Sequence, residues 1–140
     1  RVQKLCANDC YNPSDERLRI TRIEIVRIRP QITPDEKVDG LIDDPWMVHE
    51  CPANGDGCSF TFSDPAFAEG ERMATYYARA IQEPTERINA DNLRCTYDAE
   101  GNCLEVNMCY GDDRTAASDE CTRPVEERAW SSPIFVEYRN

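Results

Sequence analysis

Eight cysteines are the residues whose type and spacing most clearly predict chemistry in this sequence. Because they are even in number in a short chain rich in turn residues, they predict a disulfide framework and an oxidising compartment. They cluster into four local couples, and the most economical pairing is Cys6–Cys10, Cys51–Cys58, Cys95–Cys103 and Cys109–Cys121. The third couple is the best founded, because Gly101 lies in the intervening "DAEGN" and is free to take the positive φ of a tight turn. Two strands leaving that turn bring the flanking cysteines within disulfide reach.

Zinc binding is the alternative use of such cysteines. Structural zinc sites favour C-x2-C or C-x4-C pairs with histidines nearby, whereas the couples here enclose three, six, seven and eleven residues. His49 is the only histidine. The spacing therefore favours disulfides over zinc.

Clustered carboxylates are the second group that could carry chemistry. The "GDDRTAASDE" segment offers the weak calcium candidates Asp112, Asp113, Asp119 and Glu120, in a loop whose ends a Cys109–Cys121 bridge would hold together. Calcium prefers several carboxylate and carbonyl oxygens on such a loop, but a solvated acidic loop is the alternative and the more common one. The "DGLIDDP" segment holds a smaller cluster, and "DAEGN" lacks the glycine and closing glutamate of an EF-hand.

Groups for acid–base or nucleophilic catalysis are not arranged in a known pattern. His49 has no partner motif, no serine lies in a G-x-S-x-G elbow, and the predicted disulfides leave no free thiol. We therefore assign no catalytic residue and no cofactor other than calcium. The aromatic residues at 46, 60, 62, 76, 77 and 130 could line a carbohydrate platform, although core packing is the default interpretation.

Net charge restricts the partners. The chain carries 27 acidic and 16 basic residues, a formal charge of −11. Such a surface repels phosphate backbones and anionic lipid, so neither nucleic acid nor a membrane surface is an expected partner. No apolar run is long enough for a membrane span.

The elements that must position these groups are mostly strands. Alternating apolar residues predict strands over 18–30, 41–43 with 46–50, 58–62, 71–84, 92–98 with 102–108, and 127–138, and one helical turn over 63–70. The phase shift at Val26 is compatible with a bulge or with a two-sided strand, and Pro133 makes the last strand an edge or bulged strand. Residues 71–84 are ambiguous, because their Ala, Met, Glu and Arg favour helix, but within this β pattern we predict a strand. This pattern predicts a mainly β, disulfide-rich antiparallel β-sandwich with long loops. We expect a disulfide-pinned entry segment at 1–17 and a single β-sandwich domain at 18–140.

Four stretches together resemble a known bacterial family: "ITRIEIVRIRPQ", "LIDDPWMVHECP…GCSFTF", "YYARAIQEPT…INADNLRC" and "CYGDDRT…DECTRPVEERAWSSPIFV". They are similar, in order over residues 18–136, to the C-terminal part of domain of unknown function 3604, and "VEERAWSSPIFV" is the most specific match. The resemblance implies a longer, exported protein related to the PHP-type metal-dependent phosphoesterases, with its metal ligands upstream of this part. None of those ligand motifs falls on this sequence.

Two functional hypotheses follow. The first is the non-catalytic C-terminal portion of an exported hydrolase-like protein, which stabilises or caps the catalytic part and is itself no enzyme. The second is an independent extracellular structural or binding subunit, such as a filament or surface component, assisted or not by calcium. The partners are accordingly the upstream catalytic part of the same precursor, or further copies of the chain. In both cases the expected location is periplasmic or extracellular, and the lack of an initiator Met leads us to expect a processed or excerpted precursor.

Overall fold

The computed structural model describes residues 17–53 and 57–139. Within these ranges the strands are β1 (Ile20–Ile28), β2 (Ile42–Glu50), β3 (Ala74–Gln82), β4 (Thr85–Ile88), β5 (Cys95–Tyr97), β6 (Cys103–Val106), β7 (Thr122–Val125), β8 (Arg128–Trp130) and β9 (Ile134–Val136). Two short helical segments, α2 (Ala66–Glu69) and α3 (Ala90–Arg94), complete the list. The prediction of a mainly β, antiparallel, disulfide-bonded fold is confirmed, with a second helical segment that the sequence did not indicate. The predicted entry segment falls almost wholly in residues 1–16, outside the described residues.

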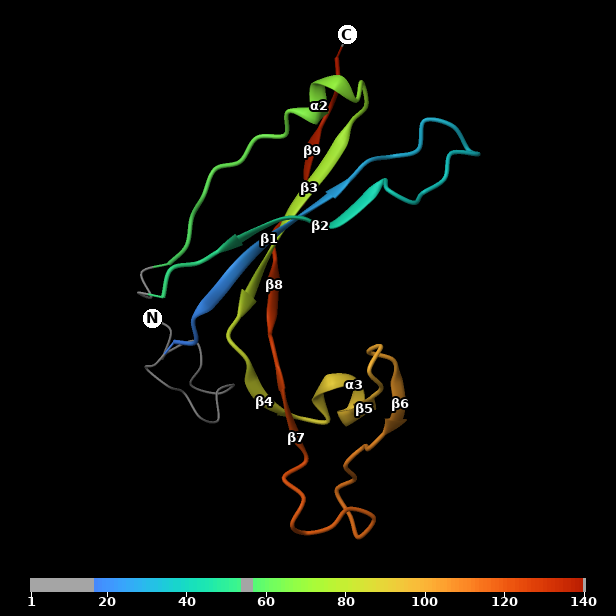
Figure 1. The fold of residues 1–140 in the computed structure, drawn as a ribbon. Helices are drawn as coiled ribbons and strands as arrows, with labels where there is room; N and C mark the ends of the chain where they lie inside the picture. Colours follow the sequence, from blue (N-terminus) through green and yellow to red (C-terminus); the bar gives the residue numbers. More distant parts are fainter. Residues whose placement is uncertain (1–16, 54–56, 140) are drawn as a thin grey trace.

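A five-stranded antiparallel sheet forms the larger part of the molecule (Figure 1). Its order is β2-β1-β3-β8, and β9 also pairs with β3, beyond the end of β8. The β1–β2 register shifts between Ile25 and Arg27, which is the bulge that the phase shift at Val26 allowed. The ambiguous segment around residues 71–84 forms strand β3 at the centre of the sheet, as predicted.

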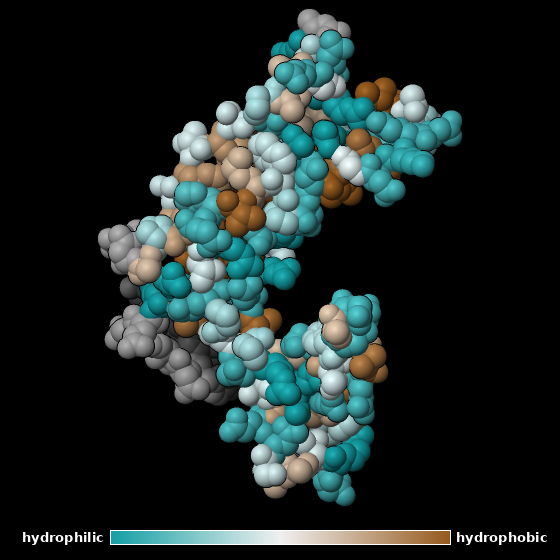
Figure 2. Space-filling view, in the orientation of Figure 1, coloured by the Kyte–Doolittle hydropathy of each residue, from teal (hydrophilic) through white to brown (hydrophobic). Residues whose placement is uncertain are grey.

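Two smaller ribbons extend from this sheet. The β4–β7 ribbon continues the line of β3 and β8, and the β5–β6 hairpin lies beyond it beside α3 (Figure 1). The space-filling view shows a hollow between the sheet and the β5–β6 end of the molecule (Figure 2). The molecule is therefore elongated, and its outlying ribbons do not form a second layer on the large sheet.

One face of the large sheet, which we call the covered face, carries the core. Ile25, Ala74 and Tyr76 are buried at its centre. Half-buried apolar residues pack around them, namely Ile23, Trp46, Met47, Phe60, Phe67, Ala78 and Val136. The layer on this face is the irregular segment 57–65 followed by α2, which brings Phe60 and Phe67 onto the strands.

The strand predicted for "CSFTF" is wrong, because residues 57–63 are irregular. Phe60 stacks on His49 with ring centroids 4.4 Å apart, and Phe62 lies 5.7 Å from Trp46. Both rings are thus used to cover the face of the sheet. A segment lying over a face has no neighbouring strand edge with which to form ladder hydrogen bonds.

The predicted final strand over 127–138 is divided into β8 and β9. The break lies at Ser131–Pro133, where the Ser131 N–H donates to the carbonyl of Ala78 at 2.9 Å and the Ser131 hydroxyl accepts from the Ala78 N–H at 2.9 Å. A serine side chain thus takes the place of a ladder acceptor. Because Pro133 has no N–H, the ladder cannot continue through it.

The α3 segment is a left-handed turn. Asp91, Asn92 and Leu93 have φ values of 53°, 49° and 59°, a conformation that costs an L-residue about 1–2 kcal/mol. Within the described ranges 17–53 and 57–139, no helix is long and apolar enough to cross a membrane.

Candidate functional site

Three of the four predicted disulfides are formed. Cys51–Cys58, Cys95–Cys103 and Cys109–Cys121 have Cα–Cα distances of 5.4, 5.7 and 5.5 Å, within the usual range for a disulfide. The fourth predicted pair, Cys6–Cys10, lies outside the described residues. Each observed bridge closes a local loop, as the clustering of the cysteines indicated.

The turn between Cys95 and Cys103 is the one that the sequence predicted. Gly101 has φ 83°, which an L side chain would resist. The Asp98 carboxylate accepts hydrogen bonds from the N–H groups of Glu100 and Asn102 at 3.0 and 2.7 Å. The side-chain amide of Asn102 also donates to this carboxylate, at 3.0 Å, and contributes most to lowering the pKa of Asp98, with the backbone bonds adding to it. The carboxylate is therefore part of the turn and is not free to act as a metal ligand.

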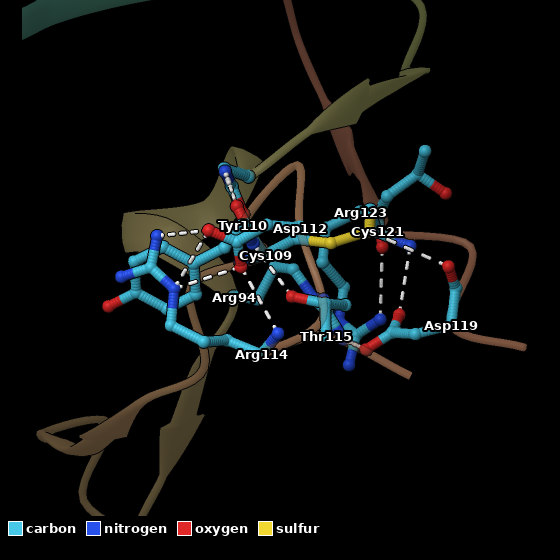
Figure 3. Close-up of a disulfide and its surroundings, with 11 residues drawn as sticks. Arg94, Cys109, Tyr110, Asp112, Arg114, Thr115, Asp119, Cys121 and Arg123 are labelled. Atoms are coloured by element: carbon cyan, nitrogen blue, oxygen red, sulfur yellow. Dashed lines mark hydrogen bonds and ion pairs between the residues drawn. A yellow bond between two sulfur atoms is a disulfide. The ribbon is translucent and has the colours of Figure 1, made fainter. Parts of the chain in front are cut away.

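The acidic 109–121 loop uses two of its four candidate carboxylates internally (Figure 3). Asp112 forms an ion pair with Arg114 at 2.6 Å, and this contact lowers the pKa of Asp112. Asp119 accepts from the Cys121 N–H at 2.9 Å and pairs with Arg94 at 2.8 Å. Figure 3 shows these carboxylates on opposite sides of the view, Asp112 beside Arg114 and Asp119 beside Cys121.

The remaining candidates, Asp113 and Glu120, are exposed. Among the described residues, no group of three or more His, Cys, Asp or Glu side chains is arranged to hold a metal ion. In the "DGLIDDP" cluster, Asp43 pairs with Arg27 at 2.9 Å and Asp44 pairs with Arg79. A calcium site in the 109–121 loop stays a prediction, and such a site would have to displace arginines from two of its ligands.

The predicted aromatic platform is divided between the two faces of the sheet. Trp46, Phe60, Phe62 and Tyr76 form one packed cluster on the covered face, with neighbouring ring centroids 5.7–6.2 Å apart. Trp130 is on the opposite face, because it is paired with Arg79 and not with an even-numbered residue of β3. The six aromatic residues therefore do not form a single surface.

The polar cluster that the sequence did not reveal is centred on Asp64. This carboxylate is only 7% exposed and accepts from the Tyr76 hydroxyl at 2.6 Å and from Arg27 at 2.8 Å. Its other oxygen accepts from the Ala66 N–H at 3.0 Å, at the start of α2. The Arg27 guanidinium also lies 4.8 Å from the centre of the Trp46 ring, in the range of a cation–π contact. Asp64 thus joins the start of α2 to β1 and β3.

Electrostatics fix the protonation of this cluster. Burial alone would raise the pKa of Asp64, but the hydrogen bonds from Tyr76 and Arg27 outweigh it and lower that pKa. Burial, together with the hydrogen bond to the Asp64 carboxylate, raises the pKa of Tyr76 to about 12. Near neutral pH the carboxylate is therefore ionised and the phenol protonated. The ionised carboxylate and the protonated phenol are complementary hydrogen-bond partners, an arrangement suited to anchoring structure.

Two shallow pockets lie against this cluster. One of about 190 Å³ has Arg27, Arg29 and Arg72 on its walls, and one of about 250 Å³ is lined mainly by Phe62, Phe67, Ile134 and Val136. The arginines of the first are already paired, Arg27 and Arg29 with Asp43 and Arg72 with Glu36 at 2.9 Å. Because these charges are balanced inside the chain, the first pocket is a poor anion site.

The sequence analysis placed Asp64 in the helical turn predicted over 63–70 and gave it no further role. The cluster depends on Arg27 and Asp64, which are 37 positions apart, and no local pattern indicates a pairing of that range. The signal in the sequence was that Arg27 alternates with Ile23 and Ile25 along β1 and so falls on their face.

The fold and the site together define a disulfide-bonded, antiparallel β chain with a structural ion-pair cluster. No family model, no curated protein and no solved structure matches this chain.

Proposed function

We propose that this chain is the non-catalytic C-terminal β-rich portion of an exported, hydrolase-like protein, and that it stabilises or caps the catalytic part. The proposal starts from the resemblance of residues 18–136 to the end of a longer protein. The Asp64 cluster supports it, because the Asp64 carboxylate stays ionised and the Tyr76 phenol stays protonated near neutral pH. A general acid or base would need to change its protonation state in that range.

The observation that carries the proposal is the incomplete burial of the chain. Among the described residues, nine apolar residues are buried and seventeen large apolar residues are exposed. Exposed apolar side chains are found on the sheet, at Ile134 and Phe135, and on the β5–β6 hairpin, at Leu104 and Val106. Surfaces of this kind are typical of protein that packs against something further.

The disulfides support an exported location. Three disulfides in one small chain are stable in the periplasm or outside the cell and rare in a reducing cytoplasm. We therefore place the protein in a periplasmic or extracellular compartment.

The second candidate function is an independent extracellular structural or binding subunit. It is favoured by the position of the three disulfides in residues 17–53 and 57–139, because each of them closes a local loop and none of the three joins the ribbons to the sheet. A chain stapled in this way can remain folded without further domains.

The reading frame upstream of Arg1 separates the two functions. The proposal expects several hundred further codons that include a histidine-rich metal site. A signal peptide directly before Arg1 would contradict it and support the independent subunit. As a second test, hydrogen exchange can be compared between the chain alone and the whole precursor. We expect the amides of β5 and β6 to be more protected in the precursor, and equal protection would contradict the capping role.

A further inference from the structure

The second face of the large sheet carries a set of exposed apolar side chains around two buried ones, Val26 and Ile81, each 1% exposed. We call it the open face and define it by Ile28, Ile42, Val48, Tyr77, Trp130 and Phe135. The strand registers place these side chains in rows across the sheet: Ile42, Ile28, Thr75 and Phe135 form one row, and Val48, Glu24, Arg79 and Trp130 form another. Ile42 is 56%, Trp130 61% and Phe135 66% exposed.

A groove runs along the open face beside its two large aromatic residues. It has a volume of about 480 Å³, and Tyr77, Trp130 and Phe135 are among the residues that line it. A tryptophan and a tyrosine beside an apolar groove are the residue types that contribute most to protein–protein binding.

The charges at the centre of the open face are paired within the chain. Glu24 accepts from Arg79 at 2.8 Å, with both side chains 12% exposed. Arg22 makes two hydrogen bonds to Glu126 at 2.7 and 2.8 Å and one to Glu24 at 2.9 Å. Glu50 and Arg128 share this face by register, are exposed and have no ion pair to a described residue, but they lie at the end of the sheet where β2 ends and β8 begins. Covering the centre of the face therefore buries paired charges, and the two unpaired ones can stay in solvent at the rim.

Both edges of the sheet are unsuited to strand addition. On one edge, β2 contains Pro45, and on the other, Pro133 separates β8 from β9. Neither proline has an N–H to donate to an added strand, and prolines at edges are a usual means of preventing such pairing. The open face, and not an edge, is therefore the part of this sheet suited to association.

We propose that a second copy of this chain packs on the open face, so that two sheets lie face to face across a two-fold axis. Charge permits this, because the strands of the large sheet carry four arginines and four carboxylates. The excess negative charge lies elsewhere, much of it in residues 91–120. The rows on the face are self-complementary, since an apolar row from one copy can lie on the same row of the other.

The open face is also large enough for a stable dimer interface. Strands of nine residues are about 30 Å long and lie about 4.8 Å apart. Four strand positions therefore present roughly 600 Å² of flat area, and projecting side chains increase it toward the ~800 Å² that each partner contributes to a stable dimer. The proposal does not depend on the function of any upstream part.

Two neighbouring residues give a matched test. Phe135 and Ile134 are adjacent in β9 and almost equally exposed, at 66% and 64%, but they point to opposite faces of the sheet. The mass of the chain is measured by sedimentation from 1 to 200 µM, for the native chain and for Phe135→Ser and Ile134→Ser. We expect the native chain and Ile134→Ser to dimerise, and Phe135→Ser to raise the dissociation constant by roughly tenfold or more.

Three results would overturn the proposal: a native chain that is monomeric up to 200 µM, a dimer unaffected by Phe135→Ser, or a dimer lost in Ile134→Ser alone. Circular dichroism of each variant establishes that the fold is retained.

Trp130 supplies a second readout, because its fluorescence should shift to shorter wavelength as the native dimer forms. The shift should be absent in Trp130→Phe, in which only Trp46 reports, and a shift retained there would also contradict the proposal.

Discussion

The side-chain amide of Asn89 makes both of its hydrogen bonds to a single residue, Cys109. Its oxygen accepts from the Cys109 N–H at 2.6 Å, and its nitrogen donates to the Cys109 carbonyl at 2.9 Å. The Asn89 N–H donates in turn to the carbonyl of Cys121, at 3.0 Å. One asparagine therefore joins the end of β4 to both halves of the Cys109–Cys121 disulfide.

Removing this amide should loosen the loop that the disulfide closes. Asn89 has φ 54°. Asn89→Gly therefore removes the side chain without straining the backbone, because glycine adopts positive φ readily. We expect a loss of about 1–2 kcal/mol in the free energy of unfolding, because two half-buried backbone groups lose their partners. Urea denaturation measures the loss. Asn92→Gly is the control, since Asn92 has φ 49° and its amide makes one exposed hydrogen bond, to the Tyr97 hydroxyl, and an equal loss there would contradict the role given to Asn89.

The Asp64 cluster should appear as a dependence of stability on acid pH. In the folded protein the pKa of Asp64 is below the ordinary aspartate value, which is about 3.9. The ionised carboxylate therefore contributes stability above that pH, and this contribution is lost as the pH falls through the folded pKa. At pH 7 we expect Asp64→Asn to cost roughly 2 kcal/mol, because Arg27 is left without a buried counter-charge.

The measurement is urea denaturation of both proteins from pH 7 to pH 2.5. The difference between the native chain and Asp64→Asn should shrink as the pH falls below about 4. The exposed Asp113 supplies the matched control, Asp113→Asn. A difference that is constant with pH would mean that the charge of Asp64 does not stabilise the fold.

Tyr76 should give the opposite pH dependence. Its folded pKa is about 12, above the ordinary value of about 10. The stability that it contributes is therefore complete below pH ~10 and is lost as the pH rises from there through 12. Ultraviolet titration of the phenols should show a late-ionising group that disappears in Tyr76→Phe, while Tyr97, whose pKa is also raised, by its hydrogen bond to Asp91, stays in the titration. If Tyr76→Phe leaves the titration above pH 11 unchanged, the hydrogen bond to Asp64 is not formed in solution.

What the sequence predicted correctly is local. The Cys95–Cys103 turn is specified by Gly101 and the carboxylate of Asp98, which are three positions apart. The alternation in β1 and the cysteine couples are likewise contained within short segments. Strand β3 was predicted correctly because large and small side chains alternate without a break from Tyr77 to Ile81.

What the sequence did not predict is long-range. Strands β4 and β7, "TERI" and "TRPV", have four residues each and pair across more than thirty positions, so neither has a periodicity long enough to detect. Phe60 and Phe62 alternate like a strand, yet they cover a face of the sheet. Alternation reports which side chains share a side, but it does not report whether a neighbouring strand is present.

The disulfides allow a test of how independent the β5–β6 hairpin is. Replacing Cys95 and Cys103 together by serine removes a short loop closure without leaving a free thiol. We expect a loss of about 2–3 kcal/mol in the stability of this hairpin. Hydrogen exchange should show lower protection for the amides of β5 and β6, while β1 and β3 keep theirs, because the hairpin does not pack on the large sheet (Figure 1).

The matched control is the double replacement of Cys109 and Cys121, which opens the acidic loop instead. Residues 95–106 should then keep more of their protection than in the first variant, and Asn89 should lose the order that Cys109 gives it. Equal loss of protection in β1 and β3 with either variant would show that sheet and ribbons unfold as one unit.

The number of disulfides in the native chain is checked beforehand by mass. Reduction of all eight cysteines adds eight hydrogens if four bridges are present, and a gain of six would mean that Cys6 and Cys10 are unpaired.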